Sequence, residues 1–312
     1  MFRRDIKNNF EKIKKLIPNK HIRVLNVTHK GCMDGCGAQI MLDNVFTNLT
    51  SVECTYNNID KTLRNIFLDD YDVVIITDIA PEHDDSVLDI SNKFILIDHH
   101  QTAKRFYDPN KLRFVYDGQC GTMLTKIFLE EIFDTNLSYL NELSTLLNDY
   151  DMWHLQDSRS KQMNILFYSM WNQKFRKRFG SGNVNFGQEE LDLFKQKEHE
   201  FNQVYNNIDF YDLESINATF IIADSFINDI SHKALNEEGY NIIFIRNPIN
   251  KNTSVRTNLE NFDIGAFLFE LEVGGGHAQS AGMKVLDNES LNATMMIVEK
   301  KLYERLPEIR KR

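Results

Sequence analysis

The chain has 312 residues, of which 42% are hydrophobic and 26% are charged, and its formal net charge at pH 7 is −9. These values are typical of a globular protein with about two domains, and they exclude a disordered tail, a collagen and a coiled-coil rod. A chain with this net negative charge is also poorly suited to binding long duplex DNA, because neutralisation of the phosphates dominates that affinity.

The first half of the chain alternates helical patterns with short β-branched runs. Apolar residues at helical spacing predict one helix over 2–16, which Pro18 ends. Strands are expected at 22–27, 52–56, 73–77 and 94–97, a glycine-punctuated loop at 31–37, and helices at 38–49, 63–68, 124–133 and 137–147. This alternation predicts a parallel sheet with helices on both faces.

The second half begins with a charged amphipathic helix at 189–205, which is expected to connect two domains. Further strands are expected at 218–223, at 241–245, around Arg256 and near 283–286, with helices at 226–235 and at the C-terminus. We therefore predict an α/β protein with a parallel-sheet domain at 1–185, a linker helix at 186–212 and a smaller mixed-sheet domain at 213–312. A cleft is expected between the two domains.

Acidic and imidazole side chains follow the ends of three predicted strands, and another acidic pair ends a helix. These residues are His29 with Cys32 and Asp34, then Asp78, then Asp98 with His99 and His100, and finally Asp149 with Asp151. Because the carboxyl ends of parallel strands meet at one edge of a sheet, we expect these groups to lie together. Clustered carboxylates repel one another, and bound cations relieve that repulsion. Mixed oxygen and nitrogen ligands suit Mn²⁺, and two such ions can share one carboxylate.

These motifs, in this order, resemble those of the DHH phosphoesterase family with its associated C-terminal domain, in the nanoRNase-like branch. The matching segments are His29–Gly35, Thr77–Pro81, Asp98–His100, Asp149–Trp153 and Gly274–His277 with Ala281 and Gly282. The resemblance covers nearly the whole chain. It implies two divalent metal ions, most simply Mn²⁺, hydrolysis of phosphodiester or phosphomonoester bonds, and a second domain that supplies substrate-binding groups.

The resemblance also assigns roles to single residues. His29 and Asp34 resemble ligands of one metal, Asp78 the bridging carboxylate, and His99 a ligand of the second metal. Asp98 would hold the imidazoles in place, and His100 would orient the site or contact phosphate, so that Asp78, Asp98, His99 and His100 form the catalytic set. In the fourth motif we favour Asp151 as the ligand and leave Asp149 open.

Cys32 stands where the family usually has an aspartate. A thiolate there would be a softer ligand that favours zinc over manganese, whereas a neutral thiol would leave that metal one ligand short. Cys36, one helical turn further, is expected to pack inside the protein.

The predicted substrate-binding residues lie near the C-terminus. Gly274, Gly275 and Gly276 would let backbone N–H groups approach an anion, and the following segment would add a helix N-terminus. His277 would donate to a phosphate oxygen, and Arg256 would contact the substrate phosphate or base. Trp153 and Phe114 are expected to be core residues, although either ring has the surface to stack on a base.

We expect a phosphodiesterase that degrades short oligonucleotides by two-metal activation of water, as a nanoRNase-like exonuclease. A cyclic-dinucleotide phosphodiesterase and a 3′,5′-bisphosphate nucleotide phosphatase are the close alternatives, and a non-catalytic nucleotide-binding module is the alternative of another class. A RecJ-type exonuclease fits less well, because the chain has no room for an added single-strand-binding domain.

The apolar runs are too short to span a bilayer, and the four cysteines form no CxxC pair. With no apolar signal segment after the charged N-terminus, these features predict a cytoplasmic protein without a membrane partner. The sequence is also compatible with a homodimer.

Overall fold

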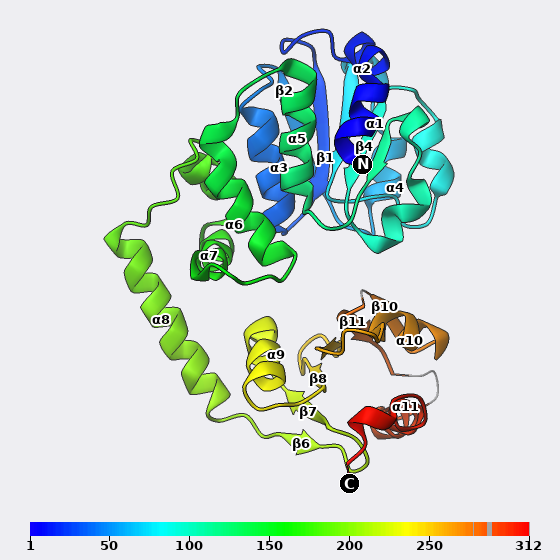
Figure 1. Cartoon of the computed structure of the whole chain (residues 1–312), viewed down its shortest axis with the longest axis vertical. Helices are drawn as coiled ribbons and strands as arrows, with labels where there is room; N and C mark the ends of the chain where they lie inside the picture. Colours follow the sequence, from blue (N-terminus) through cyan, green and yellow to red (C-terminus); the bar gives the residue numbers. More distant parts are fainter. Residues whose placement is uncertain (277, 286–288, 312) are drawn as a thin grey trace. The chain divides into compact units, whose positions relative to one another are not determined.

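The computed structural model describes residues 1–276, 278–285 and 289–311 of the chain (Figure 1). It divides into two compact units, Met1–Phe194 and Lys195–Arg312. The first unit is built on a five-stranded parallel sheet and the second on a six-stranded mixed sheet, each with helices, so the predicted fold class is confirmed. The helix expected at 189–205 is α8 (Gln188–Tyr205), and the division between the units falls within it.

The strands of the first unit are all parallel and stand in the order β2-β1-β3-β4-β5. They are β1 (Val24–His29), β2 (Leu49–Cys54), β3 (Val73–Thr77), β4 (Phe94–Asp98) and β5 (Arg113–Val115). Every residue of β3 and β4 is buried, as their continuous apolar sequences require for strands covered on both faces. The order of strands reverses at β1, so β1 and β3 flank a switch point, where open α/β sheets bind ligands.

Helices cover both faces of this sheet and enclose two hydrophobic cores. The helices are α1 (Phe2–Asn8), α2 (Phe10–Leu16), α3 (Met33–Asp43), α4 (Ile59–Arg64), α5 (Gly121–Phe133), α6 (Asn141–Asp151) and α7 (Ser158–Phe179). Val73 and Ile75 of β3 pack into the core that most of these helices share, whereas Val74 and Ile76 face the core under α4. Figure 1 shows α3 and α5 side by side, and they are in direct contact.

Short 3₁₀ helices complete the described part of the chain, at Leu68–Asp70, Asp85–Asp89, Gln101–Phe106, Pro109–Lys111, Ser138–Leu140 and Pro307–Ile309. None of the helices in the described ranges combines the length and the apolar character that crossing a membrane requires.

Several expectations for the first unit are wrong. The helix expected at 38–49 ends at Asp43, and the one expected at 63–68 ends at Arg64. The single helix expected over 2–16 is broken at Asn9, whose side-chain Nδ2 donates to the Asp5 carbonyl at 2.9 Å and so competes with the helical hydrogen bonds. The loop expected at 31–37 is the start of α3, which begins at Met33. Position 35 lies inside this helix and requires a glycine, because a Cβ at Gly35 would come within 2.7 Å of the His29 carbonyl oxygen. The glycine therefore reflects close packing and not a loop.

The second unit has the strand order β10-β11-β9-β8-β7-β6, in which only β7 and β8 are parallel neighbours. Its strands are β6 (Tyr211–Asp212), β7 (Ala218–Ile222), β8 (Ile242–Arg246), β9 (Thr253–Thr257), β10 (Gly274–Gly276) and β11 (Ser280–Met283), and its helices are α9 (Ile227–Asn236), α10 (Ile264–Glu270) and α11 (Leu291–Arg305). The last strand lies earlier than expected, at β11, and position 286 is outside the described residues. α9 packs on one face of the sheet, and α10 and α11 pack on the other.

One buried carboxylate anchors the N-terminal helix α1 to the segment around β5. Asp5 in α1 is 5% exposed, and it accepts hydrogen bonds from the Tyr107 hydroxyl at 2.6 Å and from the Tyr116 hydroxyl. Burial alone would raise the pKa of Asp5, but the two phenols lower it below the ordinary 3.8. The carboxylate therefore stabilises the fold fully above this value, and the contribution is lost as the pH falls through the lowered folded pKa.

We predict that Asp5→Ala lowers the free energy of unfolding of the first unit by about 1–3 kcal/mol at pH 7, because two phenols lose their buried acceptor. Urea unfolding followed by tryptophan fluorescence measures this unit selectively, since Trp153 and Trp171 are the only tryptophans of the chain and both belong to it. Glu11→Ala, at an exposed position of α2, is the control. Equal losses in the two variants would contradict the anchoring role.

Candidate metal centre

The ends of three adjacent strands bring acidic and imidazole groups together at the switch point of the first sheet. Thr28 of β1 pairs with Thr77 of β3, and Thr77 pairs with Ile97 of β4. The next residues along these strands are His29, Asp78 and Asp98. They therefore lie side by side at the carboxyl edge of the sheet. The expected convergence of strand ends is therefore present in the structure.

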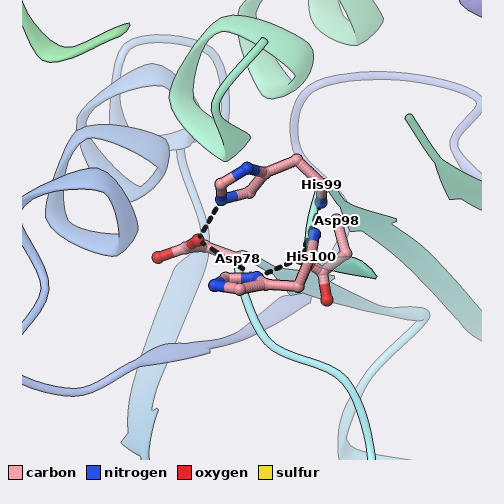
Figure 2. Close-up of side chains that lie close together, drawn as sticks. All are labelled: Asp78, Asp98, His99 and His100. Carbon is pink, nitrogen blue, oxygen red and sulfur yellow. Dashed lines mark hydrogen bonds and ion pairs between the residues drawn. The ribbon is translucent and has the colours of Figure 1, made fainter. Parts of the chain in front are cut away.

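Asp78 lies at the centre of the cluster and is fully buried. Its carboxylate is 3.2 Å from His99 Nε2, 3.8 Å from His29 Nδ1 and 3.9 Å from His100 Nδ1. Figure 2 shows the imidazoles of His99 and His100 turned toward this carboxylate. The backbone of Asp78 is left-handed, with φ of 58°, which is uncommon for a residue other than glycine and turns the chain sharply at the end of β3.

Asp34 enters the cluster from the first turn of α3 and is held by the start of another helix. Its two carboxylate oxygens accept hydrogen bonds from the backbone N–H groups of Gly121 at 2.6 Å and Thr122 at 2.7 Å, at the N-terminus of α5. These N–H groups have no partner within their own helix. Burial, together with the charges of Asp78 and Asp151, nevertheless raises the pKa of Asp34 to about 8.

The structure separates the two aspartates of the fourth motif. Both carboxylate oxygens of Asp149 accept backbone hydrogen bonds, from Gln156 at 3.0 Å and from Asp157 at 3.2 Å, so this side chain stabilises the loop after α6. Asp151 points into the cluster, with Oδ2 3.4 Å from His99 Nε2. The geometry therefore places Asp151, and not Asp149, beside the other candidate ligands.

Asp98 positions the histidines that follow it. One carboxylate oxygen accepts hydrogen bonds from the backbone N–H of His99 at 2.7 Å, from that of His100 at 3.2 Å and from His100 Nδ1 at 2.7 Å (Figure 2). These contacts fix the turn after β4 and the orientation of the His100 ring. Asp98 thus accepts from the His100 ring but only from the backbone of His99, and its part in catalysis stays a prediction.

The cluster places negative charge where water is largely excluded. Although burial opposes their charged forms, the neighbouring carboxylates raise the pKa of His99 to about 10 and that of His100 to about 9. The His99 hydrogen bond and the nearby imidazoles lower the pKa of Asp78 despite its burial. Protons on the imidazoles thus compensate for buried carboxylates, and bound cations would take their place.

Several side-chain atoms of the cluster that could bind a metal are buried and have no hydrogen-bond partner. Among the residues that the structure describes, His29 Nδ1, Asp78 Oδ2, Asp98 Oδ2 and Asp151 Oδ2 are buried without a hydrogen-bond partner. Buried polar atoms without a hydrogen-bond partner are costly, and a bound ion is one of the ordinary explanations for them. Donors within 4.8 Å of one another form three groups: His29 with Cys32 and Asp78; Asp34 with His99 and Asp151; and Asp78 with Asp98, His99 and His100. The residues present therefore fit divalent metal ions bound by mixed oxygen, nitrogen and sulfur ligands.

The candidate residues of the second unit lie on neighbouring strands. Arg256 on β9 pairs in register with Ser280, and the next residue of β11, Ala281, pairs with Gly276. The Arg256 guanidinium donates to the Asn228 side chain at 3.2 Å. His277 lies outside the described residues.

The glycine cluster forms strand β10 and is followed by another strand, so the helix N-terminus expected after it is wrong. A Cβ on Gly276 would come within 2.7 Å of the Ala281 Cα, and one on Gly274 would overlap the Gly282 carbonyl. Close pairing of two strands thus explains both glycines, and binding of an anion by their backbone remains a prediction, as it does for Gly275.

Sequence reasoning missed several residues around the cluster. The ring of Tyr56 contacts His29 with centroids 5.0 Å apart, and the start of α5 holds Asp34. Phe114 is buried as expected, but Trp153 is 39% exposed and is not a core residue.

A cavity of about 250 Å³ adjoins the cluster, and Asn164 and Tyr168 of α7 line it. The polar stretch that carries these two residues offered no motif that would have indicated them.

Comparisons with known proteins identify relatives by fold. No protein-family model and no curated protein matches the chain. A solved structure of an exopolyphosphatase-related protein from Bacteroides fragilis is 13% identical, with a TM-score of 0.53 over 96% of this chain and 97% of that one. The structure of PggH, a pGpG-specific phosphodiesterase from Vibrio cholerae, is 13% identical, with a TM-score of 0.55 over 90% of this chain and 98% of that one. The chain shares its two-unit α/β fold with these two proteins.

Proposed function

We propose that the protein is a metal-dependent phosphoesterase that hydrolyses phosphodiester bonds of short oligonucleotides in the manner of a nanoRNase. The observation that carries this proposal is the set of buried carboxylate and imidazole atoms without partners at the switch point of the sheet. The ordered motifs that resemble the DHH phosphoesterase family support it. So do the structural neighbours, one described as exopolyphosphatase-related and the other as a pGpG phosphodiesterase.

Two divalent ions, most simply Mn²⁺, would be held by side chains that share the cluster: His29, Asp34, Asp78, His99 and Asp151. Asp78 would serve both ions, and Cys32 would offer a further ligand to one of them. When bound, such ions supply positive charge to the phosphoryl oxygens and lower the pKa of water. Asp98 fixes the turn that carries His99 and His100 and orients the His100 ring, and the buried surroundings of Asp78 exclude bulk water. Both effects strengthen electrostatic stabilisation of a charged transition state.

In the second unit, Arg256 is the residue best suited to hold substrate, because its planar guanidinium can bind phosphate through two donors. A net charge of −9 agrees with small nucleotides rather than duplex DNA as substrates. Cyclic dinucleotides and 3′,5′-bisphosphate nucleotides remain the alternative substrates, and we expect the enzyme to act in the cytoplasm. The alternative class, a nucleotide-binding module, would bind these compounds without releasing product.

We predict that Asp78→Asn lowers the turnover of a short RNA by at least about 100-fold and reduces the amount of Mn²⁺ bound. Loss even of a group that only supports a metal ligand costs 10–100-fold, and Asp78 contacts three imidazoles. Mononucleotide release and isothermal titration with Mn²⁺ measure the two effects.

Asp117→Asn makes the same chemical change at an exposed residue that pairs with Lys104, and serves as the control. Equal turnover by the wild type and Asp78→Asn would refute the assignment of Asp78. Nucleotide binding without turnover in the wild type would favour the binding module.

A second prediction separates the two aspartates of the fourth motif. Asp151→Asn is expected to lower Mn²⁺ binding and turnover with little change in thermal stability, because its Oδ2 makes no hydrogen bond and only a 3.4 Å ion-pair contact with His99 Nε2 would be lost. Asp149→Ala is expected to destabilise the protein by about 1–3 kcal/mol, because two backbone N–H groups lose their acceptor, while its Mn²⁺ stoichiometry is retained. Calorimetric melting and Mn²⁺ titration of both variants provide the comparison. The reverse pattern would assign the ligand to Asp149.

A third prediction concerns Arg256. Arg256→Ala should raise KM for a dinucleotide about tenfold or more while kcat changes less, if the guanidinium contributes uniform binding. Arg256→Lys should restore only part of the affinity, because an ammonium group cannot make a bidentate contact. Steady-state kinetics at saturating Mn²⁺ measure both constants, and unchanged KM and kcat would remove Arg256 from the substrate site.

A further inference from the structure

A cavity of about 250 Å³ opens directly beside the candidate metal centre. Asp34, His29 and Asp151 form one part of its wall, and Tyr150, Asn164 and Tyr168 form another. A substrate phosphate held at the metal centre would therefore leave its neighbouring group in contact with α6 and α7. The lining of that second wall indicates which chemical group fits there.

Two of these residues belong to one face of α7. Asn164 and Tyr168 are four positions apart, so their side chains are neighbours on the helix. The Tyr168 hydroxyl donates to the Gly31 carbonyl at 3.3 Å, which holds the ring across the loop between β1 and α3, and yet 51% of the residue is exposed. The Asn164 Nδ2 donates to the Tyr150 hydroxyl at 2.8 Å, and this bond orients the amide. The wall thus combines an open aromatic surface with a fixed hydrogen-bonding amide.

A break in α7 places another aromatic ring beside Tyr168. Trp171 has φ of 58° and ψ of 174° within an otherwise helical segment, a conformation that is strained for a bulky residue. Its ring centroid lies 5.9 Å from that of Tyr168, at an angle of 85° between the planes, and the residue is 59% exposed. Tyr168 lines the cavity and Trp171 contacts Tyr168, so two perpendicular exposed rings follow one another outward from the cavity wall.

We propose that Tyr168, Asn164 and Trp171 form a nucleobase-binding subsite for the nucleotide whose phosphate lies at the metal centre. Tyr168 would stack on the face of the base, Asn164 would hydrogen-bond its edge, and Trp171 would close the outer side. The inference rests on the proposed phosphoesterase function and assigns the residues that would bind the base of its nucleotide substrate. Inorganic polyphosphate has no planar ring on which the Tyr168 side chain could stack.

Binding can be tested without catalysis. Titration with a nucleoside monophosphate in the presence of Mn²⁺ should quench tryptophan fluorescence, whereas inorganic phosphate and tripolyphosphate should not. Tyr168→Ala should weaken nucleotide binding roughly 5- to 100-fold, the range expected for loss of one base–aromatic stack. Tyr168→Phe keeps the ring and should restore most of the affinity. Trp171→Phe leaves Trp153 as the only tryptophan and should abolish the quenching.

Tyr139→Ala is the matched control, because Tyr139 is 48% exposed in the same unit and lies outside the cavity lining. Equal nucleotide affinity in the wild type and Tyr168→Ala, or equal quenching by tripolyphosphate, would overturn the subsite.

Kinetics separate this proposal from the proposed function. Tyr168→Ala should raise KM for a dinucleotide but leave KM unchanged for a dinucleotide in which the base at this position is replaced by hydrogen. If the wild type cleaves both compounds with the same KM, the subsite is wrong while the phosphodiesterase function stands. If the wild type cleaves neither compound but Tyr168→Ala still weakens nucleotide binding, the function is wrong while the subsite stands.

Discussion

Repulsion between carboxylates that are buried together is the constraint on which the first unit depends. Asp34, Asp78 and Asp151 all approach His99 within 3.7 Å, in a place where water screens their charges poorly. Burial and the charges of Asp78 and Asp151 raise the pKa of Asp34, and the neighbouring carboxylates raise the pKa of His99 and His100 against their burial, so protons on these groups partly offset the buried negative charge. A fold that keeps such a cluster sacrifices stability, which is the usual cost of a site arranged for binding or catalysis.

The surrounding scaffold is organised so that the cluster cannot relax. β3 and β4 are buried along their whole length, so the ends of the strands cannot move apart without exposing the core. Gly121 brings the start of α5 so close to Asp34 that a Cβ would lie 2.9 Å from its carboxylate. Packing therefore holds the charged groups at distances that their mutual repulsion alone would not permit.

The sequence predicts the parts of this arrangement that local chemistry determines. Continuous apolar runs identify β3 and β4, and the Asp and His residues at their ends lie together because parallel strands end at one edge. Properties that depend on tertiary contacts could not be predicted in this way. Gly35 and Gly37 in α3 resemble part of a loop until β1 is seen to leave no space for a side chain at Gly35, and Thr122 and Leu147 none at Gly37. The break at Trp171 and the exposure of Tyr168 follow from how α7 packs, and a helical pattern contains no sign of either.

Cys32 gives the two sides of the cluster different chemistry. It belongs to a group with His29 and Asp78, whereas Asp34, His99 and Asp151 form a group without sulfur. Burial raises the pKa of the Cys32 thiol well above its ordinary value, and the charge of Asp78 raises it further. Before the thiol can act as a ligand, an ion must displace this proton, and softer ions such as Zn²⁺ do so more readily than Mn²⁺. An ion bound beside Cys32 would therefore be selected by its softness, and an ion bound beside Asp34 and Asp151 by its charge and its affinity for oxygen.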